Sequence, residues 1–468
     1  MHKAQTVART EPGRARFLHV TSPAAASVVR SVMPWSNPAA GEERRLGRFC
    51  LAAAFAVTLA WGCIYIGQNH AGVVDEPGQL EAIRHFAAKQ PGIPESLPNL
   101  PGYHFLVILF SGGNPTLRSA RLVTLGCALL GLAAFAGAWR QRHGRHPGGA
   151  TLLLALLPVM QPFTAMAYTD VPAMTLLFAA CWAHFGGRRV WSAGLLALAC
   201  LVRQTCLIWA AYLLALDALE CIWPRTPGAA VPRMPWRPAL AAWLERGRWL
   251  LLLLATGAGI ILYAGRLTLG TAHGNQLQPN PATIHFAGFL LLLLGLPTWV
   301  MHAGPHFHAW REALRLRPGR TIGGTVLAFG VAAVLAATYA NPHVWNRELF
   351  WLEPPSTFVL LRNWPLVWIE RIAALRVISG LVVVGVTAGL VHRLRRERCA
   401  RELLLLLPFG AALLLTNGLV EPRYFIPPCA LALLFLAPGP SGMFRQFRWF
   451  ALLCLVQSAF LLEGLALW

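Results

Sequence analysis

The sequence predicts an all-α protein with many membrane-spanning helices. Of its 468 residues, 56% are hydrophobic and only 13% are charged, and the mean hydropathy is +0.52. Soluble globular chains carry roughly 25% charged residues. Apolar stretches of about 20 residues, the length that crosses a bilayer, recur along the chain. Together these observations indicate a polytopic membrane protein.

The positive charge of the chain predicts its orientation. The formal net charge is +21, with 40 Lys and Arg against 19 Asp and Glu. In a soluble protein this excess suggests a nucleic-acid partner, whereas in a membrane protein Lys and Arg collect on the cytoplasmic side. If the N-terminus is cytoplasmic, most of the basic residues fall on that side, in the tail and in segments 140–146, 188–189, 245–248, 311–320 and 392–401. Orientation therefore accounts for the charge, and no nucleic-acid partner is expected.

The apolar segments predict one multi-spanning domain over 49–468, with about 12–13 transmembrane helices. Residues 1–48 are basic and lack a long apolar core, which predicts a disordered cytoplasmic tail and no cleaved signal peptide. The predicted spans lie near 49–67, 122–139, 150–166, 171–185, 191–202, 206–219, 249–265, 286–302, 321–340, 374–391, 403–420, 425–437 and 450–467.

Two long segments, 68–121 and 341–373, are predicted to face away from the cytoplasm. In the first, residues 77–90 place Leu80, Ile83 and Phe86 on one helical face, as in a helix that lies in the membrane interface. The apolar run 103–110 is too short to span and is predicted to lie there too. The second segment is rich in Trp and Arg.

Polar residues gather at the predicted outward ends of the spans, although acid is scarce and the chain has only three Asp. Ionisable groups near membrane depth are costly and usually functional. The set comes from distant parts of the sequence and comprises Asp75, Glu76, Tyr168, Asp170, Arg203, Gln204, Asn346, Arg347, Glu421, Arg423 and Tyr424.

Each of these residues, taken alone, also has a structural interpretation. Asp75 or Glu76, just before a Pro, can cap the interfacial helix. Arg203 can reach lipid headgroups, and Asp170 can cap the span that follows it. Glu421 and Arg423, the last pair, can form a single structural ion pair. The convergence of the whole set on one membrane face favours a functional site.

The composition of this set suits one chemistry in particular. The guanidinium fork of Arg matches the geometry of a phosphate leaving group, and a carboxylate can take the proton of an acceptor hydroxyl. At a membrane interface, this combination predicts glycosyl transfer from a polyprenyl-phosphate-linked sugar. The alternatives are a lipid-linked-sugar flippase or other transporter, and a purely structural membrane subunit. The polar residues cluster at span ends, which argues against a translocation path.

No metal and no other cofactor is expected. The ten Cys are dispersed, without CxxC spacing, and are predicted to be small core residues. The acids in the outward motifs, Asp75, Glu76 and Asp170, come from separate segments without the spacing of metal ligands.

Several of these motifs are similar to those of a known family. In order along the chain they are "DE" (75–76) with "LPGYHFLV" (100–107), "YTDV" (168–171), "LVRQTCLIW" (201–209), "LTLGTAHGN" with "IHF" (267–286), "NPHVWNRELFW" (341–351) and "EPRYFIPP" (421–428). The chain resembles the dolichyl-phosphate-glucose-dependent alpha-1,2-glucosyltransferases of the GT-C superfamily, which add the terminal glucose of the lipid-linked oligosaccharide. It departs from them at Gly274–Asn275, where the family has an acid.

The resemblance implies a GT-C-like fold and an inverting, metal-independent transfer of a hexose, glucose in that family, on the non-cytoplasmic side. The acceptor is a glycan or a lipid-linked glycan. Carried over by position, Asp75 is the candidate base with Glu76 beside it, and Arg203, Arg347 and Arg423 are candidates for holding the donor phosphate. The remaining residues of the set are implied to shape the site. The scarcity of Lys, two against 38 Arg, favours a bacterial inner membrane over an endoplasmic reticulum membrane.

The predicted orientation can be tested by cysteine-accessibility labelling. A Cys introduced at Pro94 should react with an impermeant reagent from the non-cytoplasmic side only. Cysteines at Arg140, Arg188, Arg311 and Arg395 should react from the cytoplasmic side, because basic segments stay there. Labelling of position 94 from the cytoplasm contradicts both the orientation and the placement of the site.

Overall fold

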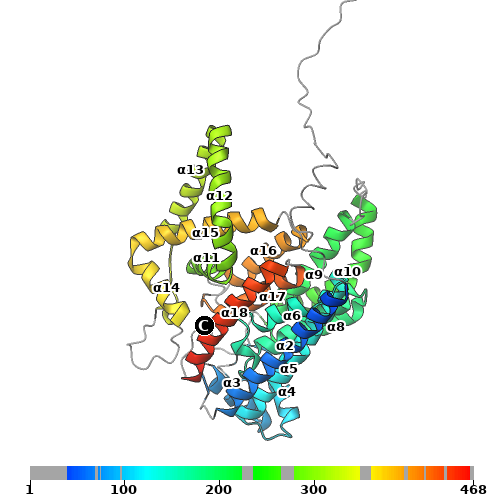
Figure 1. Cartoon of the computed structure of the whole chain (residues 1–468). Coiled ribbons are helices and arrows are strands. Elements are labelled where there is room, and N and C mark those ends of the chain that lie inside the picture. The colour runs from blue at the N-terminus through cyan, green and yellow to red at the C-terminus, as the bar shows by residue number, and fades with distance from the viewer. Residues whose placement is uncertain are drawn as a thin grey trace, which may run out of the picture. The chain divides into compact units, whose positions relative to one another are not determined.

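The structure is a computed structural model that describes residues 40–68, 72–73, 75–94, 97, 99–223, 236–264, 279–347, 360–394, 399–415, 418–436 and 440–463. The chain divides into two compact units, 1–45 and 46–468, and the candidate site lies in the second. Throughout the described residues every regular element is a helix, which confirms the all-α prediction (Figure 1).

The helices follow the apolar segments of the sequence. Those at predicted spans are α2 (Ala40–Gly67), α5 (Leu117–His143), α6 (Gly148–Ala155), α7 (Asp170–Phe185), α8 (Arg189–Val202), α9 (Cys206–Ile222), α10 (Trp236–Ala264), α11 (Ala282–Leu294), α12 (Leu296–Leu316), α13 (Pro318–Ala337), α15 (Ala373–Leu394), α16 (Ala400–Leu415), α17 (Ile426–Phe435) and α18 (Pro440–Leu462). Between them lie α3 (Glu76–Ala87), α4 (Gly102–Phe110), α14 (Leu360–Arg371), η1 (Pro162–Thr164), η2 (Val344–Asn346) and η3 (Pro422–Phe425).

Fewer helices than predicted are long enough to cross a membrane alone. In the described part of the chain, α2, α5, α10, α13 and α15 have the length and hydropathy of a span, and α11 with α12, bent by 88°, makes a possible sixth. The predicted span 150–166 is instead α6, a series of turns and η1. Almost every residue of this segment is buried, and non-helical backbone at membrane depth is tolerated where protein surrounds it. The chain is thus an integral membrane protein whose apolar segments are partly internal.

The first helix begins earlier than the sequence predicted. Residues 40–48 were assigned to the disordered tail, but α2 starts at Ala40. Glu42 and Glu43 lie in its first turn, where negative charge favours the helix N-terminus. Residues 1–39 lie outside the described residues.

Helix α5 has well-defined ends that its sequence explains. The side chains and backbones of Thr116 and Ser119 bond each other reciprocally, at 2.9 and 3.0 Å, in a capping box. The helix ends at Gly144, whose φ of 64° is the left-handed conformation that glycine adopts easily. Positive charge in the last turn, from Arg140 and Arg142, complements the helix dipole.

Paired charges lie at each end of α5, and those at the Arg121 end are almost fully buried. Arg121, near the start, pairs with Glu76. Arg142, near the end, pairs with Glu220 at 3.1 Å and with Glu402 at 2.5 Å. At 1.5 Å per residue the two arginines are separated by about 32 Å, close to the thickness of about 30 Å of bilayer hydrocarbon. The candidate site belongs to the layer at Arg121.

Close helix packing brings the segments predicted to face outward to this layer. A Cβ on Gly131 of α5 would lie 2.8 Å from the hydroxyl of Thr175 on α7, so the two helices approach closely because position 131 is glycine. A Cβ on Gly102, at the start of α4, would lie 2.7 Å from the carbonyl oxygen of Leu201. The first outward segment is therefore held against the end of α8, next to Arg203.

Candidate active site

The carboxylate of Glu76 is fully buried and accepts five hydrogen bonds. Arg121 donates two of them, from Nε at 3.0 Å and from a terminal nitrogen at 2.6 Å. Tyr65 of α2 donates its hydroxyl at 3.0 Å. The backbone N–H groups of Val73 and Ala167 donate at 3.1 and 2.8 Å. Glu76 thus joins four segments of the chain, and its oxygens have no room for a substrate.

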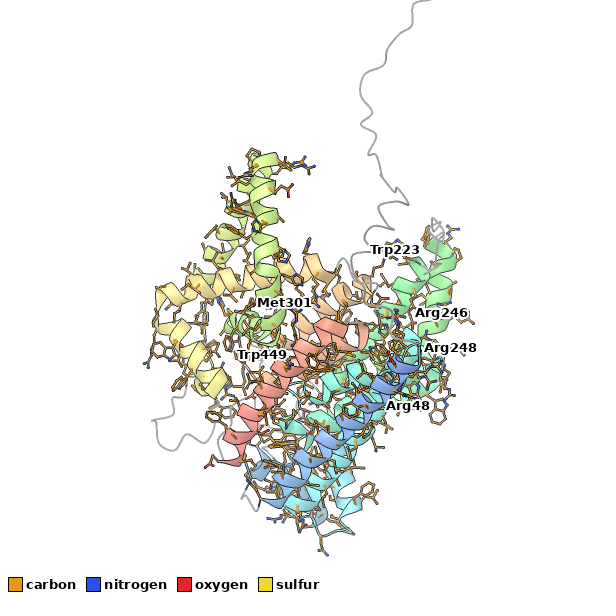
Figure 2. The ribbon with its side chains drawn as sticks, viewed as in Figure 1. Arg48, Trp223, Arg246, Arg248, Met301 and Trp449 are labelled. Atoms are coloured by element: carbon orange, nitrogen blue, oxygen red, sulfur yellow. The ribbon has the colours of Figure 1, made fainter. Side chains whose placement is uncertain are left out.

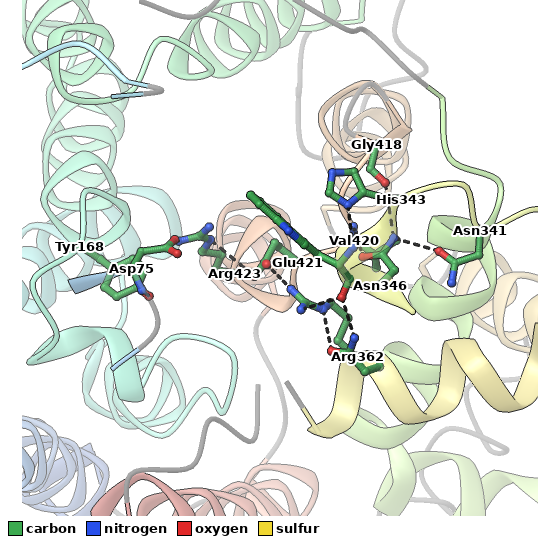
Figure 3. Close-up of polar contacts among 12 residues, drawn as sticks. Asp75, Tyr168, Asn341, His343, Asn346, Arg362, Gly418, Val420, Glu421 and Arg423 are labelled. Atoms are coloured by element: carbon green, nitrogen blue, oxygen red, sulfur yellow. Dashed lines mark hydrogen bonds and ion pairs between the residues drawn. The ribbon is translucent and has the colours of Figure 1, made fainter. Parts of the chain in front are cut away.

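Asp75, the next residue, has a very different environment. It occupies the N-cap position of α3, but its side chain makes no capping hydrogen bond. The side chain is 45% exposed, and one carboxylate oxygen accepts a hydrogen bond of 2.7 Å from Arg423 (Figure 3). The capping role considered from the sequence is therefore not the one that the structure gives Asp75. Its carboxylate points to Arg423, which is 348 positions away.

Arg423 and Tyr168 hold Asp75 from two sides. The Tyr168 hydroxyl accepts a hydrogen bond of 2.8 Å from the backbone N–H of Asp75. The Arg423 guanidinium lies 5.2 Å from the centre of the Tyr168 ring, in cation–π range. Burial, together with the charge of Asp75, raises the pKa of the Tyr168 hydroxyl well above its ordinary value. Tyr168 therefore remains neutral and serves to position the Asp75 backbone.

Arg203 forms a second ion pair beside the first. It is the C-cap residue of α8, and its guanidinium binds the Asp170 carboxylate at the start of α7. It lies 5.4 Å from the ring of Tyr424, and Arg423 lies 5.8 Å from the same ring. Tyr424 therefore connects the Asp75–Arg423 pair to the Asp170–Arg203 pair. The motifs predicted from four parts of the sequence, at 75–76, 168–171, 201–209 and 421–428, do meet in one place.

A third arginine, which the sequence reasoning missed, fixes Glu421. Arg362 of α14 is 2% exposed and binds one oxygen of Glu421, and another of its nitrogens donates to the carbonyl of Trp345 at 3.2 Å (Figure 3). The other oxygen of Glu421 lies 3.6 Å from Arg423 Nε, longer than a hydrogen bond. Glu421 thus keeps the ion pair with Arg423 that was considered from the sequence, and Arg362 is its second and closer partner. The sequence feature that indicates a basic partner for Glu421 is the excess of Arg in segment 341–373.

The neighbouring residues Asn346 and Arg347 differ in their contacts. The Asn346 side chain accepts from the backbone N–H of Val420 at 3.2 Å and donates to Asn341 at 3.0 Å, so it holds the chain just before Glu421. Arg347 is half exposed and pairs with Glu370 at 2.6 Å. The described contacts of Arg347 do not include either the Asp75–Arg423 or the Asp170–Arg203 pair. Gln204 lies in the turn directly after Arg203.

The two histidines of the first outward segment lie apart from Asp75. His104 is buried among aromatic rings, next to Phe86 and Tyr103, and burial lowers its pKa to about 4. His85 contacts the carbonyl of Gly92 at 3.2 Å. Neither histidine has a described contact with the Asp75 carboxylate, whose partner is Arg423.

Two buried polar atoms of the site lack hydrogen-bond partners among the described residues. They are Asp170 Oδ2 and Arg423 Nε. A buried unsatisfied polar atom is costly, and a bound ligand with a donor and an acceptor can satisfy both. The described ranges contain no group of three or more His, Cys, Asp or Glu side chains placed to hold a metal ion. The Gly274–Asn275 motif lies outside the described residues.

Comparisons with known proteins bear on the class of the chain. A model of the DIE2/ALG10 family matches residues 105–229, a segment that contains Arg121, Asp170 and Arg203. This match supports a membrane glycosyltransferase. No curated protein matches the chain. The crystal structure of ArnT from Cupriavidus metallidurans in the apo state is 15% identical, over 92% of this chain and 77% of that one, with a TM-score of 0.35.

Glu76→Gln should destabilise the protein strongly. The substitution leaves the buried Arg121 without its countercharge, and breaking a buried ion pair typically costs about 3–5 kcal/mol. Thermal unfolding of the purified protein in detergent, followed by tryptophan fluorescence, measures the loss. The matched control is Glu81→Gln, the same change at an exposed position of α3. Equal midpoints for the two variants contradict the structural role of Glu76.

Proposed function

We propose that the protein is a membrane-embedded, inverting GT-C glycosyltransferase. It moves a hexose, glucose by the family resemblance, from a polyprenyl-phosphate-linked donor to a hydroxyl of a glycan or lipid-linked acceptor on the non-cytoplasmic side. The observation that carries the proposal is the junction of Asp75–Arg423 and Asp170–Arg203 at Tyr424. The family match to residues 105–229 supports the transferase class.

The junction offers the two groups that such a transfer needs. The acceptor oxygen forms a bond to the anomeric carbon of the donor sugar while the bond from that carbon to the phosphate oxygen breaks. The bonding electron pair leaves with the polyprenyl phosphate, and the hydroxyl proton passes to the Asp75 carboxylate. Arg203 and Arg423 donate hydrogen bonds to the phosphate as its charge grows. One displacement inverts the anomeric carbon.

The choice of Asp75 over Glu76 follows from their contacts. Glu76 is fully buried and its carboxylate is saturated by five donors. Asp75 is 45% exposed and its carboxylate has Arg423 as its single partner in the described chain. A base must be reachable by the hydroxyl whose proton it takes. We therefore assign Asp75 as the base and Glu76 as the residue that positions it.

Asp75→Asn should abolish most of the activity while the fold is kept. Asn retains the shape and can still accept a hydrogen bond from Arg423, but it cannot take the proton. Loss of a general base costs about 10²–10⁴ in rate. The assay is product formation by the purified protein from a panel of radiolabelled polyprenyl-phosphate hexoses, with Glu81→Gln as the control. A stable Asp75→Asn protein with parental turnover excludes this mechanism, and transport without any glycosylated product favours the flippase instead.

Arg203→Lys should reduce turnover by about 10- to 100-fold, as expected when a hydrogen bond between charged groups is lost. Lysine keeps the charge beside Asp170 but lacks the guanidinium fork that matches a phosphate. The control is Arg118→Lys, the same change at an exposed position near the start of α5. Parental turnover in Arg203→Lys indicates that Arg203 serves the fold or the lipid headgroups instead of the donor.

A further inference from the structure

A groove of about 700 Å³ lies between α12 and α13, and none of its lining residues belongs to the candidate active site. The two helices are consecutive and lie side by side (Figure 1). Trp310 and Leu314 of α12 form one wall, and Ile322, Val326 and Phe329 of α13 form the other. The α13 residues recur at helical spacing, so one continuous apolar face of that helix lines the groove.

The described residues leave this groove open. Helix α12 has no buried residue, and Val326 and Phe329 on α13 are 64% and 57% exposed. Helix α13 is also one of the helices that have the length and hydropathy of a membrane span. An exposed apolar face on a spanning helix is in contact with lipid hydrocarbon, so the chemistry that suits the groove is an acyl chain.

The length of the groove matches one leaflet. Its α13 wall extends from Ile322 to Ala333, which is 11 positions or about 16 Å at 1.5 Å per residue. Half of a hydrocarbon core of about 30 Å is the depth of a single leaflet. The groove is therefore long enough for one phospholipid acyl chain and too short for an extended polyprenyl chain.

The end of the groove near the turn between the two helices is strongly basic. Segment 311–320 has four exposed arginines and one acid, Glu312, and none of the four has an ion pair among the described residues. Guanidinium groups bind phosphate through paired hydrogen bonds, and basic residues next to a span attract anionic lipids. The four are Arg311, Arg315, Arg317 and Arg320.

We propose that the α12–α13 groove is a binding site for one anionic phospholipid. Its phosphate lies among the arginines of segment 311–320 and one acyl chain lies along the α13 wall. The site does not depend on the proposed transferase activity. The lipid contributes to holding α12 against α13 along the face that the described residues leave open.

Native mass spectrometry of the purified full-length protein tests the proposal. Phosphatidylglycerol and phosphatidylcholine with identical acyl chains are titrated separately. We expect one molecule of phosphatidylglycerol to bind at least about tenfold more tightly than phosphatidylcholine, because only the anionic headgroup gains from the arginines. Equal affinities, or many equivalent molecules without saturation, overturn the proposal, since ordinary boundary lipid behaves that way.

One variant fills the groove without disturbing the helix. Gly330 lines the groove, and a Cβ added there meets no atom within 4 Å, so the ring of Gly330→Phe can enter the groove without a clash at its Cβ. Gly323→Phe is the matched control, since Gly323 is on the same helix, is equally open and does not line the groove. We expect Gly330→Phe to lose the tight site and Gly323→Phe to retain it. Equal binding by the two variants contradicts the placement of the acyl chain.

A second variant tests the headgroup contacts. The triple substitution R315Q/R317Q/R320Q should weaken phosphatidylglycerol binding by about 10- to 100-fold. The control is R237Q/R246Q/R248Q, which removes three exposed arginines of α10, two of them marked in Figure 2. An equal loss in both triples shows that net charge alone is responsible and overturns the site. Displacement of phosphatidylglycerol by a lower concentration of polyprenyl phosphate also overturns it, because the occupant is then a donor-type lipid.

Discussion

The buried ion pair between Glu76 and Arg121 is the constraint on which the candidate site depends. A carboxylate and a guanidinium that are both almost fully buried are tolerable only when their hydrogen bonds are satisfied. Tyr65 and two backbone N–H groups complete the shell of Glu76. This shell fixes α2, α5, the start of α3 and the turn at Ala167 against one another. Because Glu76 is held inward, the adjacent Asp75 is left at the open side, where it meets Arg423.

Each acid of the candidate site has one arginine as its closest ion-pair partner. Arg362 pairs with Glu421, Arg203 pairs with Asp170, and Arg423 pairs with Asp75. Glu421 already lies 3.6 Å from Arg423 Nε, and without Arg362 its carboxylate would have Arg423 as its remaining described ion-pair partner and would compete more strongly with Asp75. In the proposed reaction a donor phosphate competes with Asp75 for Arg423. Binding of the donor thus weakens the one contact that restrains the Asp75 carboxylate, before the acceptor hydroxyl needs it.

The sequence predicted more of the helices than of their contacts. Hydropathy located the apolar segments because each needs only its own residues. It did not distinguish helices long enough to span alone from an apolar segment such as 150–166, which is broken into turns and buried within the protein. The meeting of Asp75 with Arg423, and of Arg203 with Asp170, agrees with the predicted convergence. The division of roles between Asp75 and Glu76 was left open, because it depends on Tyr65 and Arg121 from other helices. Arg362 was missed because segment 341–373 was predicted as a loop, whereas α14 gives this arginine a fixed direction.

The ion pairs at the two ends of α5 make that helix intolerant of changes in length. Each added residue turns one end of an α-helix by about 100° relative to the other. An insertion between Arg121 and Arg142 would keep one arginine with its acids only by turning the other away from Glu76, or from Glu220 and Glu402. The rotation of one end of α5 relative to the other, which its length sets, is therefore fixed by these ion pairs. Substitutions along its lipid-facing side are free of this restriction, whereas insertions and deletions within it are not.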